Sequence, residues 1–143
     1  MEKYRLIILS IMLTIVCVAF SQTREEARKN IIDDITMSKK SLPFTESFLT
    51  ITNIEVKGND LFTYYFVDDR AIDFNAYVRN MKSNKKTTFL QTARNRPRYA
   101  YNLVVARLNM AVVIKAKYSG KSETIIWTAD ELKNILLEEA RNN

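Results

Sequence analysis

The sequence predicts an α+β fold: an antiparallel sheet of about four strands, built from two hairpins, with helices mainly on one face, after an N-terminal signal peptide. Two segments, residues 51–67 and 110–127, are crowded with β-branched and aromatic side chains. Each contains one of the only two glycines of the chain, Gly58 and Gly120, where a hairpin turn would need one. Apolar residues at helical spacing follow each segment. Since a two-stranded ribbon has no buried face, we expect the hairpins to join into one sheet.

Residues 1–21 are predicted to be a secretory signal peptide. A short basic start precedes an apolar run at residues 6–20, and Ala19 and Ser21 supply small side chains just before Gln22. The run is short for a membrane span, which needs roughly 20 apolar residues. We therefore expect residues 22–143 to be a single exported domain, periplasmic or secreted, with an uncleaved N-terminal anchor as the alternative.

The composition of the mature chain excludes several kinds of site. Cys17 is the only cysteine and lies in the predicted signal peptide, and the chain has no histidine. The usual general base at neutral pH, the commonest metal ligand and the thiol nucleophile are therefore missing. We expect a protein that is not an enzyme, with no catalytic, cofactor-binding or metal-binding residues. Without disulfides, it must depend on its core for stability.

The first half of the domain begins with a helix. Thr23 and Glu26 form a capping box, and we expect the helix to run to about Ser38. An apolar stripe follows at four-residue spacing, consisting of Ala27, Ile31 and Ile35. Leu42-Pro43 then breaks the helix and leads into extended chain, because the residue before a proline is driven toward β geometry. The first hairpin follows, with its turn at Gly58-Asn59.

The second half of the domain also begins with helical segments, which are followed by a hairpin and a last helix. Asp73 is a candidate N-cap for a helix that starts at Phe74 and is interrupted near residues 83–86 before it continues to about Arg94. Pro97 suits the first position of another helix. After the second hairpin, a second capping box at residues 128–131 opens a last helix.

Three consecutive aromatic residues, Tyr64, Tyr65 and Phe66, stand in the second arm of the first hairpin. They could form an exposed aromatic platform on one face of the hairpin. Alternatively, they are core residues on one face and make cross-strand pairs on the other. The sequence leaves both interpretations open.

Charge is strongly segregated along the chain. Residues 74–122 contain no Asp or Glu but eleven Lys and Arg, whereas residues 22–73 and 123–143 each carry three more acidic than basic side chains. A basic segment of this kind predicts a surface that attracts an anionic partner. The alternative is a solvated basic face that the acidic flanks of the same fold partly neutralise.

Six side chains within residues 79–98 are the candidate binding site for this anionic partner. Lys82, Lys85 and Lys86 share a helical face through their spacing. The other three flank the proline turn and are Arg94, Arg96 and Arg98. In the envelope, the partner would be a protein with an acidic surface or a polyanion, and nucleic acid is not expected outside the cell.

The turn and core residues follow a pattern that resembles small exported bacterial proteins and lipoproteins, many of them uncharacterised and some pilotin-like. The matching positions are Leu42-Pro43, Gly58-Asn59, Leu61, Tyr64-Tyr65, Asn95-Arg96-Pro97 and Gly120. The cysteine that often precedes the Asn-x-Pro turn in such proteins is absent here, as is a clear lipobox. The resemblance implies a fold of this type and an envelope accessory role.

Together these observations predict an exported, non-enzymatic binding or accessory protein of the cell envelope that contacts an acidic partner through residues 79–98. An inhibitor or immunity-type protein that blocks a specific enzyme is the alternative. A small hydrolase is the third hypothesis, although no motif points to one.

Overall fold

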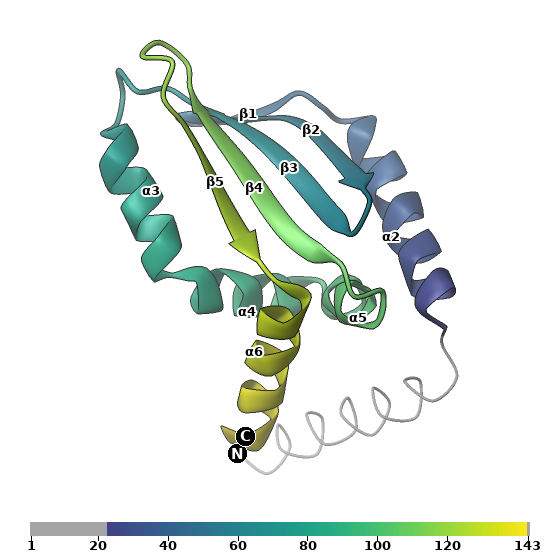
Figure 1. Ribbon diagram of the computed structural model, residues 1–143. Helices are drawn as coiled ribbons and strands as arrows, with labels where there is room; N and C mark the ends of the chain where they lie inside the picture. Colours follow the sequence, from purple (N-terminus) through teal and green to yellow (C-terminus); the bar gives the residue numbers. More distant parts are fainter. Residues whose placement is uncertain (1–22, 143) are drawn as a thin grey trace.

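The computed structural model describes residues 23–142, which form one five-stranded sheet with helices packed against it (Figure 1). The elements in chain order are α2 (Arg24–Lys39), β1 (Phe44–Glu46), β2 (Leu49–Lys57), β3 (Asp60–Val67), α3 (Phe74–Ser83), α4 (Lys85–Asn95), α5 (Pro97–Val105), β4 (Asn109–Ala116), β5 (Ser122–Trp127) and α6 (Ala129–Asn142). The α+β class is confirmed. The sheet gains a fifth strand because β1, which precedes the first hairpin, pairs with β2. The predicted signal peptide lies outside the described residues.

The order of the strands in the sheet is β1-β2-β3-β4-β5, and every neighbouring pair is antiparallel except β3 and β4. The prediction of a purely antiparallel sheet is wrong for this central pair. A tight turn between two strands makes them antiparallel. β3 and β4 are joined instead by α3, α4 and α5, which bring the chain back to the end of the sheet at which β3 begins. Such a crossover connection makes the next strand parallel.

The two predicted hairpins are confirmed. Lys57 pairs with Asp60 across the first turn, and Lys115 pairs with Ser122 across the second. Gly58 and Gly120 have φ angles of +58° and +73°, which a residue with a side chain adopts only with strain. The glycines therefore stand where the backbone of each turn needs them.

The ends of the helices also follow the sequence. Thr23 and Glu26 form the predicted capping box of α2, and the hydroxyl of Thr128 accepts from the N–H of Glu131 at the start of α6. Asp73 accepts a hydrogen bond from the N–H of Ala76 and so caps α3. The predicted interruption falls at Asn84, between α3 and α4, and Pro97 begins α5.

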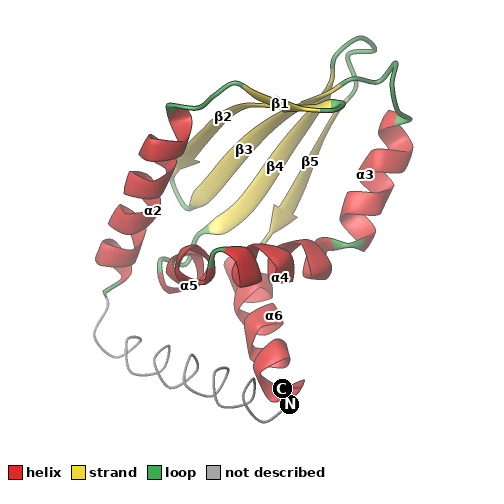
Figure 2. Ribbon diagram, turned by 180° about the vertical axis from the view of Figure 1, so that it is seen from behind, coloured by secondary structure: helices red, strands yellow, loops and turns green. Residues whose placement is uncertain are grey.

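The core lies between one face of the sheet and helices α2, α3, α4 and α5, which lie on the same side of it (Figures 1 and 2). Fully buried residues from both layers meet there, including Ile31, Leu61, Phe89, Leu103, Ile114 and Trp127. Burying a large apolar side chain contributes roughly 1.5–3 kcal/mol, so this layer holds the helices to the sheet. In the described part of the chain, no helix is long and apolar enough to cross a membrane.

Candidate functional site

The basic region predicted from the sequence, defined by Lys82, Lys85, Lys86, Arg94, Arg96 and Arg98, lies on the end of α3, on α4 and at the start of α5. Five of these six side chains have a carboxylate within ion-pair distance. The pairs are Lys82–Glu123 at 3.0 Å, Lys85–Glu131 at 2.8 Å, Lys86–Glu138 at 2.6 Å, Arg94–Glu139 at 2.9 Å and Arg96–Asp34 at 4.0 Å. Arg98 has no such carboxylate among residues 23–142.

The carboxylates of these pairs come from the acidic flanks of the chain, mainly from α6. The fold therefore brings the acidic ends and the basic middle together, as the alternative interpretation anticipated. Hydrogen bonding to Glu138 raises the pKa of Lys86, and the same contact lowers the pKa of Glu138. Binding of an acidic partner by the basic region stays a prediction, and such a partner would have to compete with these carboxylates.

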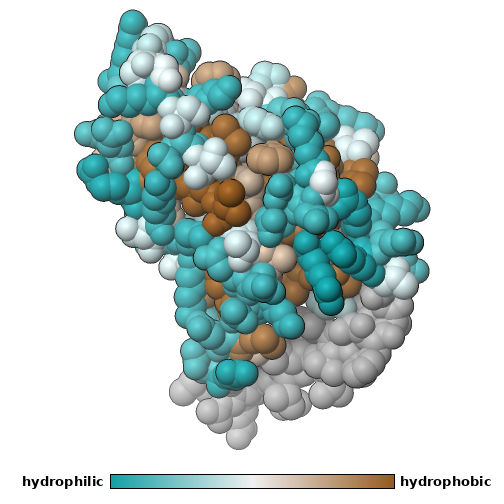
Figure 3. Space-filling view, viewed as in Figure 1, coloured by the Kyte–Doolittle hydropathy of each residue, from teal (hydrophilic) through white to brown (hydrophobic). Residues whose placement is uncertain are grey.

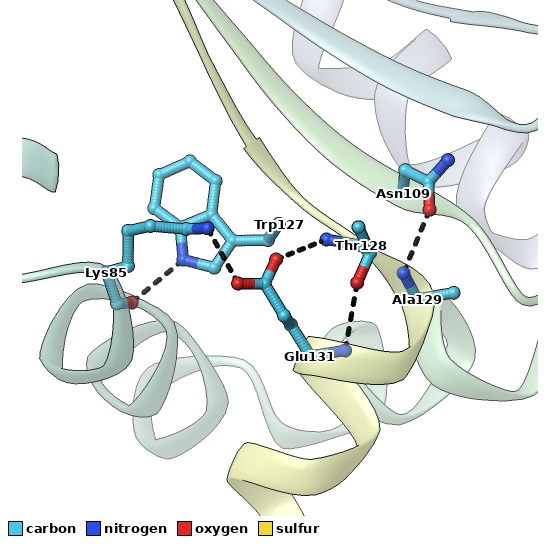
Figure 4. Close-up of polar contacts among 6 residues, drawn as sticks. All are labelled: Lys85, Asn109, Trp127, Thr128, Ala129 and Glu131. Atoms are coloured by element: carbon cyan, nitrogen blue, oxygen red, sulfur yellow. Dashed lines mark hydrogen bonds and ion pairs between the residues drawn. The ribbon is translucent and has the colours of Figure 1, made fainter.

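Lys85 has a further structural role at the point where β5 runs into α6 (Figure 4). The indole Nε1 of Trp127 donates to the carbonyl oxygen of Lys85 at 2.8 Å, and the Lys85 ammonium pairs with Glu131. The other carboxylate oxygen of Glu131 accepts from the N–H of Thr128 at 2.8 Å. The hydrogen bonds from Lys85 and Thr128 lower the pKa of Glu131, and together with the Trp127 bond they tie α4 to the start of α6.

Near the opposite end of the sheet, the carboxylate of Asp69 also forms hydrogen bonds within the protein. Asp69 accepts from the N–H groups of Tyr118 and Ser119, each at 2.9 Å, and so links the loop after β3 to the turn between β4 and β5. Hydrogen bonding by the Ser119 side chain, together with these backbone groups, lowers the pKa of Asp69 to about 2. Within residues 23–142, no cluster of His, Cys, Asp or Glu could hold a metal ion.

The sheet face opposite the core, hereafter the open face, carries an aromatic stripe. Side chains alternate between the two faces of a strand, so the stripe on β3 consists of Phe62, Tyr64 and Phe66, while Tyr65 packs against the core. Phe66 is 39% exposed, and Ile126 on β5 is 47% exposed. Both interpretations of residues 64–66 therefore hold in part, one for each face.

Hydrophobic residues gather over the strands in the middle of the molecule, with hydrophilic residues around them (Figure 3). The rings of Phe62 and Tyr64 stack with centroids 6.0 Å apart, and the Tyr64 hydroxyl donates to Glu55 at 2.7 Å. Glu55 in turn pairs with Lys57 at 2.7 Å, and this pair lowers the pKa of Glu55. These contacts fix the orientation of the stripe, and the Tyr64 hydroxyl has a hydrogen-bond partner.

A β-bulge in β2 shapes the face beside this stripe. Ile51 pairs with Tyr65 and Asn53 pairs with Tyr64, so Thr52 is an extra residue without a partner on β3. The apolar residues of β2 change phase at this point. Leu49 packs against the core before the bulge, and Ile54 and Val56 pack against it afterwards. Without the extra residue, one of the two sets would point away from the core.

Next to the bulge, the open face is hollowed. The hollow is lined by Thr52, Asn53, Tyr64, Tyr65, Phe66, Val113 and Lys115. Lys115 is exposed, and among the described residues no carboxylate lies within ion-pair distance of it. A hollow with both polar and apolar walls and one unpaired ammonium group can bind an anionic group that is attached to an apolar one.

Sequence reasoning missed this hollow, although two signals in the sequence could have indicated it. The apolar residues of the second strand stand at odd positions up to Ile51 and at even positions from Ile54, and this change of phase is typical of a bulge. Lys115 interrupts the apolar pattern of a central strand. Neither signal shows which residues of other strands lie beside them.

Comparisons with known proteins detect the fold but no sequence family: no family model and no curated protein matches the chain. Among solved structures, the pilotin EpsS of the type 2 secretion system of Vibrio vulnificus is similar with a TM-score of 0.56 at 12% identity, over 76% of this chain and 94% of that one. The type II secretion system pilotin AspS of Vibrio cholerae is similar with a TM-score of 0.53 at 9% identity, over 79% and 98%. A Pseudomonas aeruginosa protein, described as a secreted protein, has a TM-score of 0.52 at 15% identity, over 75% and 93%.

Proposed function

We propose that this protein is an exported, non-enzymatic accessory protein of the cell envelope that binds another protein through the open face of its sheet. The observation that carries the proposal is the apolar surface formed by the aromatic stripe and Ile126: Phe66 and Ile126 are 39% and 47% exposed on a face that α2 to α5 do not cover. An apolar patch rimmed by polar residues marks an interaction site in soluble proteins, and aromatic residues are enriched at protein interfaces.

The shared fold supports an envelope setting for this binding role. Two of the structural neighbours are pilotins of secretion systems, and a third is described as a secreted protein. The predicted signal peptide at residues 1–21 agrees with export, and we propose the periplasm or the cell surface as the location. The fold by itself does not fix a function, so the open face provides the specific argument.

Site-specific photo-cross-linking in living cells tests this function. A benzoylphenylalanine is placed at Phe66 or Ile126, and in control proteins at Met37 on α2 or at Arg94 on α4, all of which are at least partly exposed. We expect a discrete adduct with one protein partner from the two open-face positions and none from the controls. Equal adducts from all four positions, or none from the open face, would contradict the proposal.

A further inference from the structure

The charged side chains of the open face are almost all partnered within the sheet. Glu55 is held by Lys57 and by the Tyr64 hydroxyl. Asp60 accepts a hydrogen bond from the side-chain amide of Asn109 at 2.8 Å. Lys115 is the exception within the described strands, because it is exposed on a central strand and has no carboxylate nearby. Among the residues of the described strands, the open face therefore presents one uncompensated positive charge, beside its aromatic stripe.

A second hydrogen-bond donor lines the same hollow. The side-chain oxygen of Asn53 accepts from the N–H of Ile54 at 2.9 Å. This bond fixes the orientation of the amide and leaves its Nδ2 group as a donor with no partner among residues 23–142. The hydroxyl of Thr52 is directed to the carbonyl oxygen of Tyr64 at 3.3 Å, so it is already engaged. The free polar groups of the hollow are thus donors, which bind acceptor oxygens.

The remaining walls of the hollow are apolar and include the aromatic side chains of Tyr64 and Phe66 and the aliphatic side chain of Val113. A carboxylate that a partner presents between two apolar side chains can pair with the donor groups of the hollow, while the apolar side chains contact its apolar walls. Polyanions are recognised differently, because several cations must neutralise several neighbouring charges. Here the other positive charge of the strands, Lys57, is already paired.

We propose that the hollow at the bulge of β2 recognises an Asp or Glu side chain that a partner protein presents between apolar residues. Lys115 supplies the charge, Asn53 a hydrogen bond, and the aromatic stripe the apolar contact. This inference rests on the proposed function and adds the chemistry of the partner. A charge-assisted contact at a partly solvated site fixes the register of a partner more than it adds affinity.

Selection from a phage-displayed library of random peptides on the immobilised protein tests the inference. We expect the enriched peptides to carry Asp or Glu flanked by apolar residues. The variant Lys115→Glu should select Lys or Arg at the same position instead. A peptide that the unmodified protein selects should bind Lys115→Glu about fivefold more weakly, as expected for a partly exposed ion pair.

Matched variants separate recognition from a general charge effect. Lys133→Glu makes the same change at an exposed position on α6 and should leave the selected peptides unchanged. Lys115→Met should remove the preference for acidic residues without creating one for basic residues. Because Lys115 is exposed, both of its variants should melt within about 2 °C of the unmodified protein.

Several results would overturn the inference. One is selection of the same acidic peptides by Lys115→Glu, and another is the absence of any charge preference in the unmodified protein. A third is binding to phosphatidylglycerol vesicles that Lys115→Glu abolishes while no acidic peptide is selected, which would assign the hollow to a polyanion. If open-face positions cross-link to a partner in cells but the selections do not depend on Lys115, the proposed function stands and this inference fails.

Discussion

The basic region on α3, α4 and α5 and the open face of the sheet both carry positive charge, but their lysines have different surroundings. In the basic region, Lys82, Lys85 and Lys86 each lie at 3.0 Å or less from a carboxylate of β5 or α6. On the open face, Lys57 pairs with Glu55, but Lys115 has no carboxylate within ion-pair distance in the described part of the chain. The number of charges in a segment therefore says little about which charges a partner can reach.

The difference follows from what each region packs against. The basic region lies where the C-terminal helix returns to the domain, so the fold itself supplies its counter-charges. Within residues 23–142, no helix packs over the open face, so its side chains keep the contacts that the sheet provides. We infer that the basic region mainly holds α6 in place and that the open face binds a partner protein. The substitutions described below test this division of roles between the two surfaces.

The largest effect is expected at Trp127, which lies on the core side of β5 beside the basic region. Trp127→Ala should lower the free energy of unfolding by about 3–5 kcal/mol, because it leaves a cavity and removes the bond to the Lys85 carbonyl. Its neighbour Ile126 faces the open side, so Ile126→Ala is the matched control and should cost less than about 1 kcal/mol. Urea denaturation of both variants measures the difference, and equal losses would contradict the assignment of the faces.

A smaller effect is expected at Asp69, whose pKa is lowered to about 2 by hydrogen bonds from Ser119 and Tyr118. A depressed pKa means that the carboxylate stabilises the folded state above its unfolded pKa of 3.8 and loses this contribution as the pH falls toward 2. Asp69→Asn should therefore be less stable than the unmodified protein at neutral pH, and the difference should shrink as the pH falls below about 4. Urea midpoints measured across this range provide the test.

Asp33→Asn, at an exposed position of α2, controls for the change in net charge. A stability difference for Asp69→Asn that stays constant from neutral pH to pH 2 would show that its carboxylate does not hold the turn between β4 and β5.

A small effect is expected from reversing one ion pair of the basic region. Lys86→Glu places two acidic side chains together and should lower the melting temperature by about 2 °C, because exposed pairs contribute little. The double variant Lys86→Glu with Glu138→Lys restores opposite charges and should recover the loss. Thermal melts at low and high salt measure both, and a double variant as unstable as the sum of its single changes would show that the pair does not form.

The smallest effect on stability is expected on the open face. Phe66→Ser should change the free energy of unfolding by less than about 1 kcal/mol, because the side chain already contacts solvent. It should nevertheless reduce the binding of the dye 1-anilinonaphthalene-8-sulfonate to the folded protein, since the dye reports exposed apolar surface. Unchanged dye fluorescence would show that the stripe is not an accessible apolar surface.

The parts of this structure that local chemistry determines could be predicted from the sequence. The capping boxes, the two glycine turns, Pro97 at the start of α5 and the break at Asn84 each depend on a few consecutive residues. The parallel pairing of β3 with β4 could not be predicted in this way, because it depends on where the three connecting helices bring the chain.

The candidate site, like the parallel pairing of β3 and β4, depends on tertiary packing and could not be predicted from a few consecutive residues. The hollow combines Asn53 of β2, Phe66 of β3 and Lys115 of β4, which the bulge and the parallel register bring together. The charge segregation was visible in the sequence, but the pairing of Lys86 with Glu138, far along the chain, was not. Which basic side chains stay unpaired is a property of tertiary packing.

The most direct test of the division between the two surfaces combines the cross-linker with charge reversal. Benzoylphenylalanine at position 66 is introduced into the Lys115→Glu and Lys86→Glu backgrounds, and the yield of the adduct with the partner is measured in cells. We expect the yield to fall severalfold in the Lys115→Glu background and to stay within about twofold of the unmodified protein in the Lys86→Glu background. A yield that persists with Lys115→Glu and falls with Lys86→Glu would contradict the account and place binding on the basic region.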